Sequence, residues 1–217
     1  MTTALTAYLT NAATTTLTTA NQLATALNSG AATTKSTTVG TSTGYGEVYA
    51  QGNASAWAAA GSIGNPSGNG FLWDATTLEG QQIIAGTWTP TLRFQLSTGT
   101  SITADCYCRA YKRSSGGVYT LIGSMLFSGK SITTSGNNVS FSGSSLGAVS
   151  FATGDKLYID VWLDITANSS GSGSATVKMN EASAANTGIA TAQITTPGYQ
   201  SNQWLIRAFH RSAGRIQ

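Results

Sequence analysis

Alternation of apolar and polar residues with a period of two is the clearest pattern in this chain. One face of the stretch 155–167 is apolar and consists of Leu157, Ile159, Val161, Leu163 and Ile165. The opposite face carries Tyr158, Asp160, Trp162, Asp164 and Thr166. This spacing predicts a half-buried β-strand. The same alternation predicts strands over 91–96 and 104–111.

Further strands are predicted between loops that are rich in Ser, Gly and Asn. The predicted segments are 46–50, 118–127, 139–141, 175–179, 189–195 and 204–209. The loops between them have the composition of turns that join antiparallel strands. The pattern therefore predicts an all-β protein in which residues 45–199 form an antiparallel two-sheet β-sandwich of the jelly-roll type.

The first 44 residues have a different character and predict an extended N-terminal arm. Residues 5–10 fit a short strand, and the apolar residues of 17–27 have helical spacing, although many β-branched threonines weaken a helix there. Residues 31–44 are rich in Thr, Ser, Gly and Ala, which is typical of an extended arm or a linker. An arm that lies on another protein and a disordered leader both fit this composition.

Composition narrows the class of protein. Thr, Ser and Gly make up about two-fifths of the chain, and only 9% of residues are charged, against about 25% in an ordinary domain. The hydrophobic content of 41% is enough to build a core, which excludes disorder of the whole chain. A surface so poor in ions favours close packing against other protein chains, including copies of itself.

The charges are unevenly distributed, and they single out a basic C-terminal segment, residues 200–217. Acidic and basic side chains are equal in number up to residue 206, so the net charge of +3 lies in the last residues. The candidate interface residues there are Trp204, Arg207, Phe209, Arg211 and Arg215. A last strand with a solvated basic end is the alternative. Three arginines are too few to indicate a nucleic-acid partner.

Signals for a membrane or for secretion are not found in the sequence. No run of about 18 apolar residues is present, which excludes a membrane-spanning helix and a membrane partner of that kind. The first thirty residues lack the basic start and the continuous apolar stretch of a signal peptide. We therefore expect synthesis in the cytoplasm.

The groups that catalysis needs are scarce. Cys106 and Cys108 are two residues apart, which predicts reduced, buried thiols on one face of a strand. His210 is the single histidine and lies about a hundred residues away from them. No nucleophile with a base, metal-ligand set or phosphate-binding glycine loop is apparent. The sequence therefore predicts that the chain is not an enzyme, with no catalytic, metal-binding or cofactor-binding residues and no cofactor.

The polar face of the strand 155–167 is a candidate ligand or contact face. Its residues Tyr158, Asp160, Trp162 and Asp164 place aromatic rings beside carboxylates, a combination that can stack on and orient sugar rings. A carbohydrate-binding or adhesin-like module, from a tail fibre or a secreted protein, is therefore an alternative, as is an extracellular filament subunit. Coverage of these rings by protein is the competing explanation, and the low surface charge favours it.

Three runs of the sequence resemble a known class of protein. FLWD at 71–74 with AGTWTPTLRF at 85–94, and FATGDKLYIDVWL at 151–163, resemble the β-sandwich domains of tailed-bacteriophage virion proteins. The opening LTAYLTN at 5–11 is similar to the starts of some small phage structural proteins. The resemblance implies a structural protein located in the virion, foremost a capsid decoration or cement protein, with a head fibre or tail component as alternatives. Its partners would be the major capsid protein or other virion proteins, and copies of itself.

Overall fold

The computed structural model describes residues 3–25, 34–40, 42–48, 60–135, 137–140, 142–170, 175–180 and 192–201. Within these ranges the chain forms fifteen β-strands and one short 3-10 turn, η1 (Thr76–Leu78). The strands are β1 (Thr3–Ala13), β2 (Asn21–Ala24), β3 (Thr34–Gly40), β4 (Gly44–Glu47), β5 (Phe71–Leu72), β6 (Gln81–Ile83), β7 (Gly86–Thr98), β8 (Ser101–Arg113), β9 (Tyr119–Thr133), β10 (Asn137–Ser140), β11 (Ser144–Leu146), β12 (Val149–Ser150), β13 (Lys156–Asn168), β14 (Ala175–Asn180) and β15 (Gln193–Ser201).

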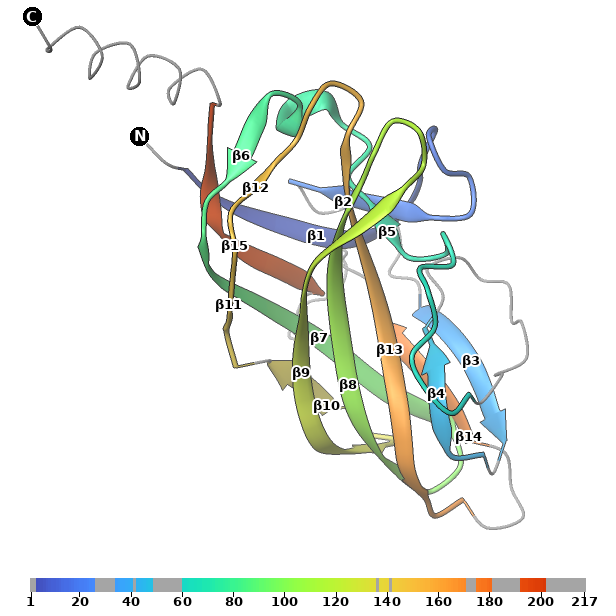
Figure 1. Cartoon of the computed structure of the whole chain (residues 1–217). Helices are drawn as coiled ribbons and strands as arrows, with labels where there is room; N and C mark the ends of the chain where they lie inside the picture. The colour runs from blue at the N-terminus through green and yellow to red at the C-terminus, as the bar shows by residue number, and fades with distance from the viewer. Residues whose placement is uncertain are drawn as a thin grey trace, which may run out of the picture.

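Hydrogen bonds join these strands into one sheet that curves round the core until it nearly closes on itself (Figure 1). Its main order is β3-β14-β7-β15-β1-β2-β5-β13-β8-β9, and β4, β6, β10, β11 and β12 attach beside this path. The pairs are antiparallel except for β2 with β5. The all-β class is confirmed. Two separate sheets of a jelly-roll sandwich are not confirmed, because β1, β2 and β5 link the β7 side of the sheet to the β13 side.

The segment predicted to be an extended arm supplies two of these linking strands. Residues of β1 pair with β15 near the other end of the chain, with Thr6 opposite Thr195. Leu5 and Leu9 on β1 and Leu23 on β2 are buried in the core. Over 3–13 and 21–24 the arm prediction is therefore wrong, since period-two burial of leucines holds this segment in the sheet. The helical spacing is also misleading over the described residues 17–25, where β2 forms instead.

The core lies inside the curve of the sheet. The predicted inward residues of β7, Leu92, Phe94 and Leu96, are all buried there, and Trp88 on the same strand is fully buried. Cys106 and Cys108 on β8 are free, buried thiols, as predicted. Burial, together with the neighbouring Asp105 carboxylate, raises the pKa of Cys106 to about 12, so this thiol stays protonated at neutral pH.

The strand predicted from 155–167 is β13, and it is buried on both faces instead of one. Its apolar side packs into the core as predicted, but every residue from Lys156 to Leu163 is also buried. β13 pairs with β8 along one edge and with β4 and β5 along the other. The expectation of a half-buried strand is wrong because other parts of the chain cover its polar face.

Most other predicted strands are present, with shifted ends. The prediction of 118–127 corresponds to β9, that of 139–141 to β10 and that of 175–179 to β14. The predicted strand 204–209 and the candidate interface residues of the basic C-terminal segment, from Trp204 to Arg215, lie outside the described residues. In the part of the chain that the structure describes, no helix has the length and apolar character needed to cross a membrane.

Candidate functional site

The candidate site lies on the face of β13 and β8 that points away from the core. Antiparallel register places Tyr158 opposite Tyr111 and Asp160 opposite Arg109. Trp162 continues the same face toward the end of β13. Cross-strand partners share one face of a sheet, so the alternation that buries leucines on one side brings these aromatic and charged side chains together on the other.

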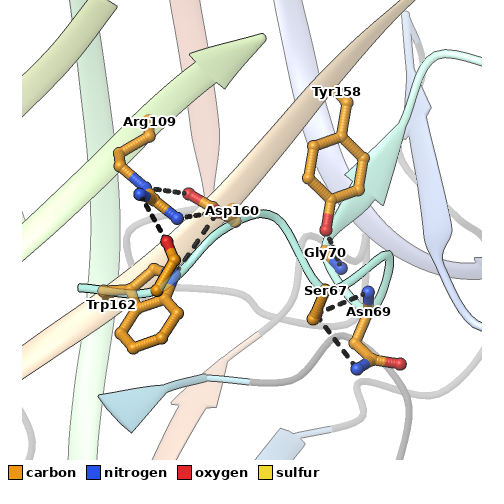
Figure 2. A network of polar contacts seen from close by, with 8 residues as sticks. Ser67, Asn69, Gly70, Arg109, Tyr158, Asp160 and Trp162 are labelled. Atoms are coloured by element: carbon orange, nitrogen blue, oxygen red, sulfur yellow. Dashed lines mark hydrogen bonds and ion pairs between the residues drawn. The ribbon is translucent and has the colours of Figure 1, made fainter. Parts of the chain in front are cut away.

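Residues 60–70, here called the cover segment, run across this face (Figure 2). Arg109 donates from Nη1 to the carbonyl oxygen of Gly64 at 3.0 Å. The backbone N–H of Gly70 donates to the hydroxyl oxygen of Tyr158 at 2.8 Å. Two side chains of the sheet thus satisfy two backbone groups of the cover segment, and they fix it near its middle, at Gly64, and at its end, at Gly70.

An ion pair between Arg109 and Asp160 is the centre of the site. Arg109 donates from Nε to Asp160 Oδ1 at 2.8 Å and from Nη2 to Oδ2, and the indole N–H of Trp162 also donates to Oδ2 at 3.3 Å. The guanidinium lies 5.2 Å from the ring centre of Tyr111 and 5.4 Å from that of Trp162. Asp160 is fully buried, so this bidentate pairing is what allows a carboxylate to remain there.

Glu47 on β4 adds a second buried carboxyl to the same place. It is only 5% exposed, and its Oε1 has no hydrogen-bond partner. Burial raises its pKa to about 7; the Asp160 carboxylate adds to this shift, whereas a hydrogen bond with Ser67 and the charge of Arg109 oppose it. One cation therefore faces two carboxyls, and Glu47 is the one that takes up a proton near neutral pH.

A small apolar cluster closes the other end of the site. Tyr158 packs with Tyr111, Leu72 and Ala20, apart from the main core. The ring centre of Tyr119 on β9 lies 5.0 Å from that of Tyr158, in an edge-to-face arrangement. Burial raises the pKa of the Tyr158 hydroxyl above its ordinary value, so this group remains protonated.

Three of the four residues predicted for a ligand face come together here, and one does not. Tyr158, Asp160 and Trp162 share the site, but each is less than 10% exposed. Asp164 lies further along β13, partly exposed and opposite Asp105. The competing explanation, coverage of the rings by protein, therefore describes this face, and a sugar ring has no access to Trp162 while the cover segment is in place.

Sequence reasoning missed Glu47 as a member of the site. A signal was present, because Glu47 is the single charged residue between Lys35 and Asp74. An isolated charge in a long uncharged stretch indicates a specific partner. Its hydrogen-bond partner Ser67 and the attracting charge of Arg109 come from segments that the pattern could not place together.

The arrangement holds a proton on Glu47 and binds a segment of the chain's own backbone. The Ser67 hydroxyl, which forms a hydrogen bond with Glu47, belongs to an exposed residue of the cover segment, whereas Tyr158 and Cys108 are fully buried. Among the described residues, no group of three or more His, Cys, Asp or Glu side chains is placed to hold a metal ion. In this structure, the hydrogen bonds of the site dock the cover segment on β13 and β8.

Replacement of Gly70 by Ala tests this docking. A Cβ atom at Gly70 would collide with the carbonyl oxygen of Ile159 and lie 2.7 Å from the Tyr158 hydroxyl. We expect the variant to lose about 1–3 kcal/mol of unfolding free energy, as in other overpacked sites. Gly61→Ala is the matched control, because nothing lies within 4 Å of a Cβ there. Equal stability of the two variants in urea unfolding would show that the cover segment is not held closely.

Comparison with known proteins gives similarity of fold alone. No protein-family model and no curated protein matches the chain. Among solved structures, it is similar to a CocE/NonD family hydrolase from Staphylococcus aureus, with a TM-score of 0.55 and 9% identity over 92% of this chain and 37% of that one. An aminopeptidase from a marine sediment Thaumarchaeota archaeon matches with a TM-score of 0.50 and 11% identity over 89% of this chain and 36% of that one. The chain thus spans little more than a third of these proteins.

The prediction that the chain is not an enzyme is contradicted by this comparison, because the structures that share its fold are a hydrolase and an aminopeptidase. That prediction rested on the scarcity of acidic, basic and nucleophilic catalytic groups in this chain. In a longer enzyme such groups can lie outside the part that this fold represents. Scarcity of catalytic groups in these residues is therefore no argument against a place in a hydrolytic enzyme.

Proposed function

We propose that this chain is an assembly module that works by packing against other protein chains, as a component of a tailed-bacteriophage virion and foremost as a capsid decoration or cement protein. Its finer architecture would then be the jelly-roll-like sandwich of such proteins. The observation that carries the proposal is that the aromatic and charged face of β13 and β8 is covered by a segment of the same chain. Tyr158 and Arg109, which is paired with Asp160, hold the chain's own cover segment, so these groups are occupied within the fold and are not free to bind a partner.

The resemblance to virion proteins supports the same proposal. The runs that carry it, 71–94 and 151–163, form β5, β6, most of β7 and the first half of β13. These strands include Trp88 and Phe94, which are fully buried in the core. The similarity therefore concerns residues that build the rigid body of the module.

The proposal is tested on virus particles from the organism that encodes the chain. An antibody raised against the purified protein should detect a polypeptide of about 22.2 kDa in density-purified particles, and immunogold should label their surface. The fraction of host proteins from the same gradient is the control. Detection only in that control fraction would overturn a virion role.

The fold comparison favours a second candidate, a domain of a longer hydrolytic enzyme. This candidate rests on the hydrolase and the aminopeptidase whose folds match most of this chain but only 36–37% of their own. It predicts that the same antibody detects a much larger polypeptide. The native polypeptide should then hydrolyse an ester or an aminoacyl nitroanilide. A band of about 22.2 kDa alone would contradict this candidate and favour the assembly module.

A further inference from the structure

A second group of aromatic and acidic side chains lies on the outer face of β4, β13 and β8, further along β13 than the ion pair of Arg109 and Asp160. Antiparallel register places Tyr45 opposite Asp164, and Asp164 opposite Asp105. Tyr107 follows Asp105 by two residues on β8 and therefore shares its face. All four residues, here called the tyrosine–carboxylate face, are partly exposed.

Two tyrosine rings and a leucine supply the apolar part of this face. The ring centres of Tyr45 and Tyr107 are 6.0 Å apart, with their planes tilted by 44°. Leu126 on β9 lies opposite Tyr107 and is 44% exposed. Tyrosine rings attract cations to their faces, and exposed apolar side chains beside them add contact area for a partner.

The two carboxylates of this face lack a cation. Asp105 and Asp164 are directly opposite each other, an arrangement in which like charges destabilise a strand pair. Neither forms an ion pair with a described Lys or Arg side chain. Asp105 accepts a hydrogen bond from the backbone N–H of Gly129 at 2.6 Å, which leaves its charge in place. A cation from a partner would therefore relieve the repulsion between them.

Glu47 gives a second, independent sign of unmet negative charge. It follows Tyr45 by two residues on β4, and its Oε1 is buried without a hydrogen-bond partner. Arg109 already donates to Asp160. Over residues 45–47, 105–109 and 160–164, four carboxyl groups thus accompany a single basic side chain.

The chain itself contains a segment with the complementary charge. The net charge of +3 comes from Arg207, Arg211 and Arg215 in the basic C-terminal segment, which also carries Trp204 and Phe209. A guanidinium group can form two hydrogen bonds with a carboxylate and can stack on an aromatic ring. The composition of this segment therefore matches the tyrosine–carboxylate face in both charge and aromatic content.

The place where the described chain ends favours a neighbouring copy as the source of the segment. Ser201 at the end of β15 lies opposite Gln81, whose carbonyl oxygen accepts from the N–H of Phe151, shortly before β13 begins. Asp164 is about 26 Å further along β13 than Lys156, at 3.3 Å per residue. Figure 1 shows the end of β15 and the far end of β13 on opposite sides of the body. The segment of one copy can thus reach the face of another copy without crossing back over its own sheet.

We infer that the basic C-terminal segment of one copy binds the tyrosine–carboxylate face of a neighbouring copy. This inference rests on the proposed function, an assembly module, and names a contact through which copies assemble. Single ion pairs at a surface are weak and are screened by salt. Several arginines must therefore act together, and the association should weaken as the ionic strength rises.

Self-association of the full chain tests the inference. The wild-type protein should associate at low ionic strength in sedimentation experiments. Asp164→Lys reverses one charge of the face and should weaken association about tenfold or more. Ser145→Lys adds the same charge at an exposed position on β11 and is the control that should leave association unchanged. A wild-type protein that stays monomeric up to millimolar concentration, or association that Asp164→Lys does not weaken, would overturn the inference.

Mixing two charge-reversed variants gives a second measurement, which a failure to fold cannot imitate. The first variant carries Asp164→Lys, and the second carries Arg207→Glu, Arg211→Glu and Arg215→Glu. Each should be mostly monomeric alone. An equimolar mixture should associate, because the unchanged segment of the first variant finds the unchanged face of the second. A mixture that stays monomeric would contradict binding between copies.

These outcomes are separable from failure of the proposed function. A monomer that is still found on purified particles would overturn the binding of the segment to a neighbouring copy and leave the assembly module standing. A chain that associates in this way but is absent from particles would do the reverse.

Discussion

Replacement of Arg109 by Met is expected to lower the free energy of unfolding by about 3–5 kcal/mol, the range seen when one partner of a buried ion pair is removed. Met keeps the length of the side chain but leaves the fully buried Asp160 without its two charge-assisted hydrogen bonds. The cover segment also loses the donor to Gly64. Urea unfolding at pH 7 measures the difference.

Two companion variants decide whether the ion pair is the cause. Asp160→Asn in the Arg109→Met background removes the stranded carboxylate, so it should recover part of the loss. Lys130→Met removes a more exposed cation that lies 5.5 Å from the ring centre of Phe127, and it should cost less than about 1 kcal/mol. If Arg109→Met costs no more than Lys130→Met, the pair contributes nothing to the net stability of the fold.

Replacement of Glu47 by Gln is expected to stabilise the protein at pH 8 and to change little at pH 4. The folded protein raises the pKa of Glu47 from its ordinary value of 4.5 to about 7. The folded state therefore holds this proton more tightly than the unfolded state. Stability from this group is fully present below pH 4.5, falls as the pH rises to about 7, and then stays low. The amide of Gln never ionises, so the variant should escape a loss of about 3 kcal/mol.

The shape of the pH profile is the decisive measurement for Glu47. Wild-type stability should decline between pH 4.5 and 7, and that part of the decline should be missing from Glu47→Gln. Glu79→Gln is the control, because Glu79 is partly exposed beside Lys156 and a variant there should keep the decline. Parallel wild-type and Glu47→Gln profiles would mean that Glu47 is not protonated in the folded protein at neutral pH.

The body of the sheet was predictable from the sequence because its longest strands bury one continuous apolar face. Leu92, Phe94 and Leu96 on β7 repeat with a period of two and reach the core as predicted. The same rule located β8 and β13 to within a few residues. Period-two burial is a local property of a strand, so it can be read without knowledge of the partners.

The cover of β13 was not predictable, because it depends on contacts between distant segments. Asp160 and Trp162 have the sequence signature of an exposed polar face, and their burial depends on the hydrogen bonds that Asp160 accepts from Arg109 and from the indole N–H of Trp162. Their cover comes from residues 60–70, a loop by composition, and from the turn that contains Ala20. A paired buried charge and an exposed charge look the same in a single sequence.

The pairing of β1 with β15 has a consequence for how this protein folds. Thr6 and Thr195 are cross-strand partners although almost the whole chain lies between them. Contacts between residues so far apart in sequence are slow to form, since a very long loop must close before they provide any stability. On the ribosome, β1 is made long before β15 and cannot pair with it until β15 has emerged. Until then the segment that carries its leucines must stay in solution without a partner strand. The many threonines between these leucines make the segment polar enough to do so.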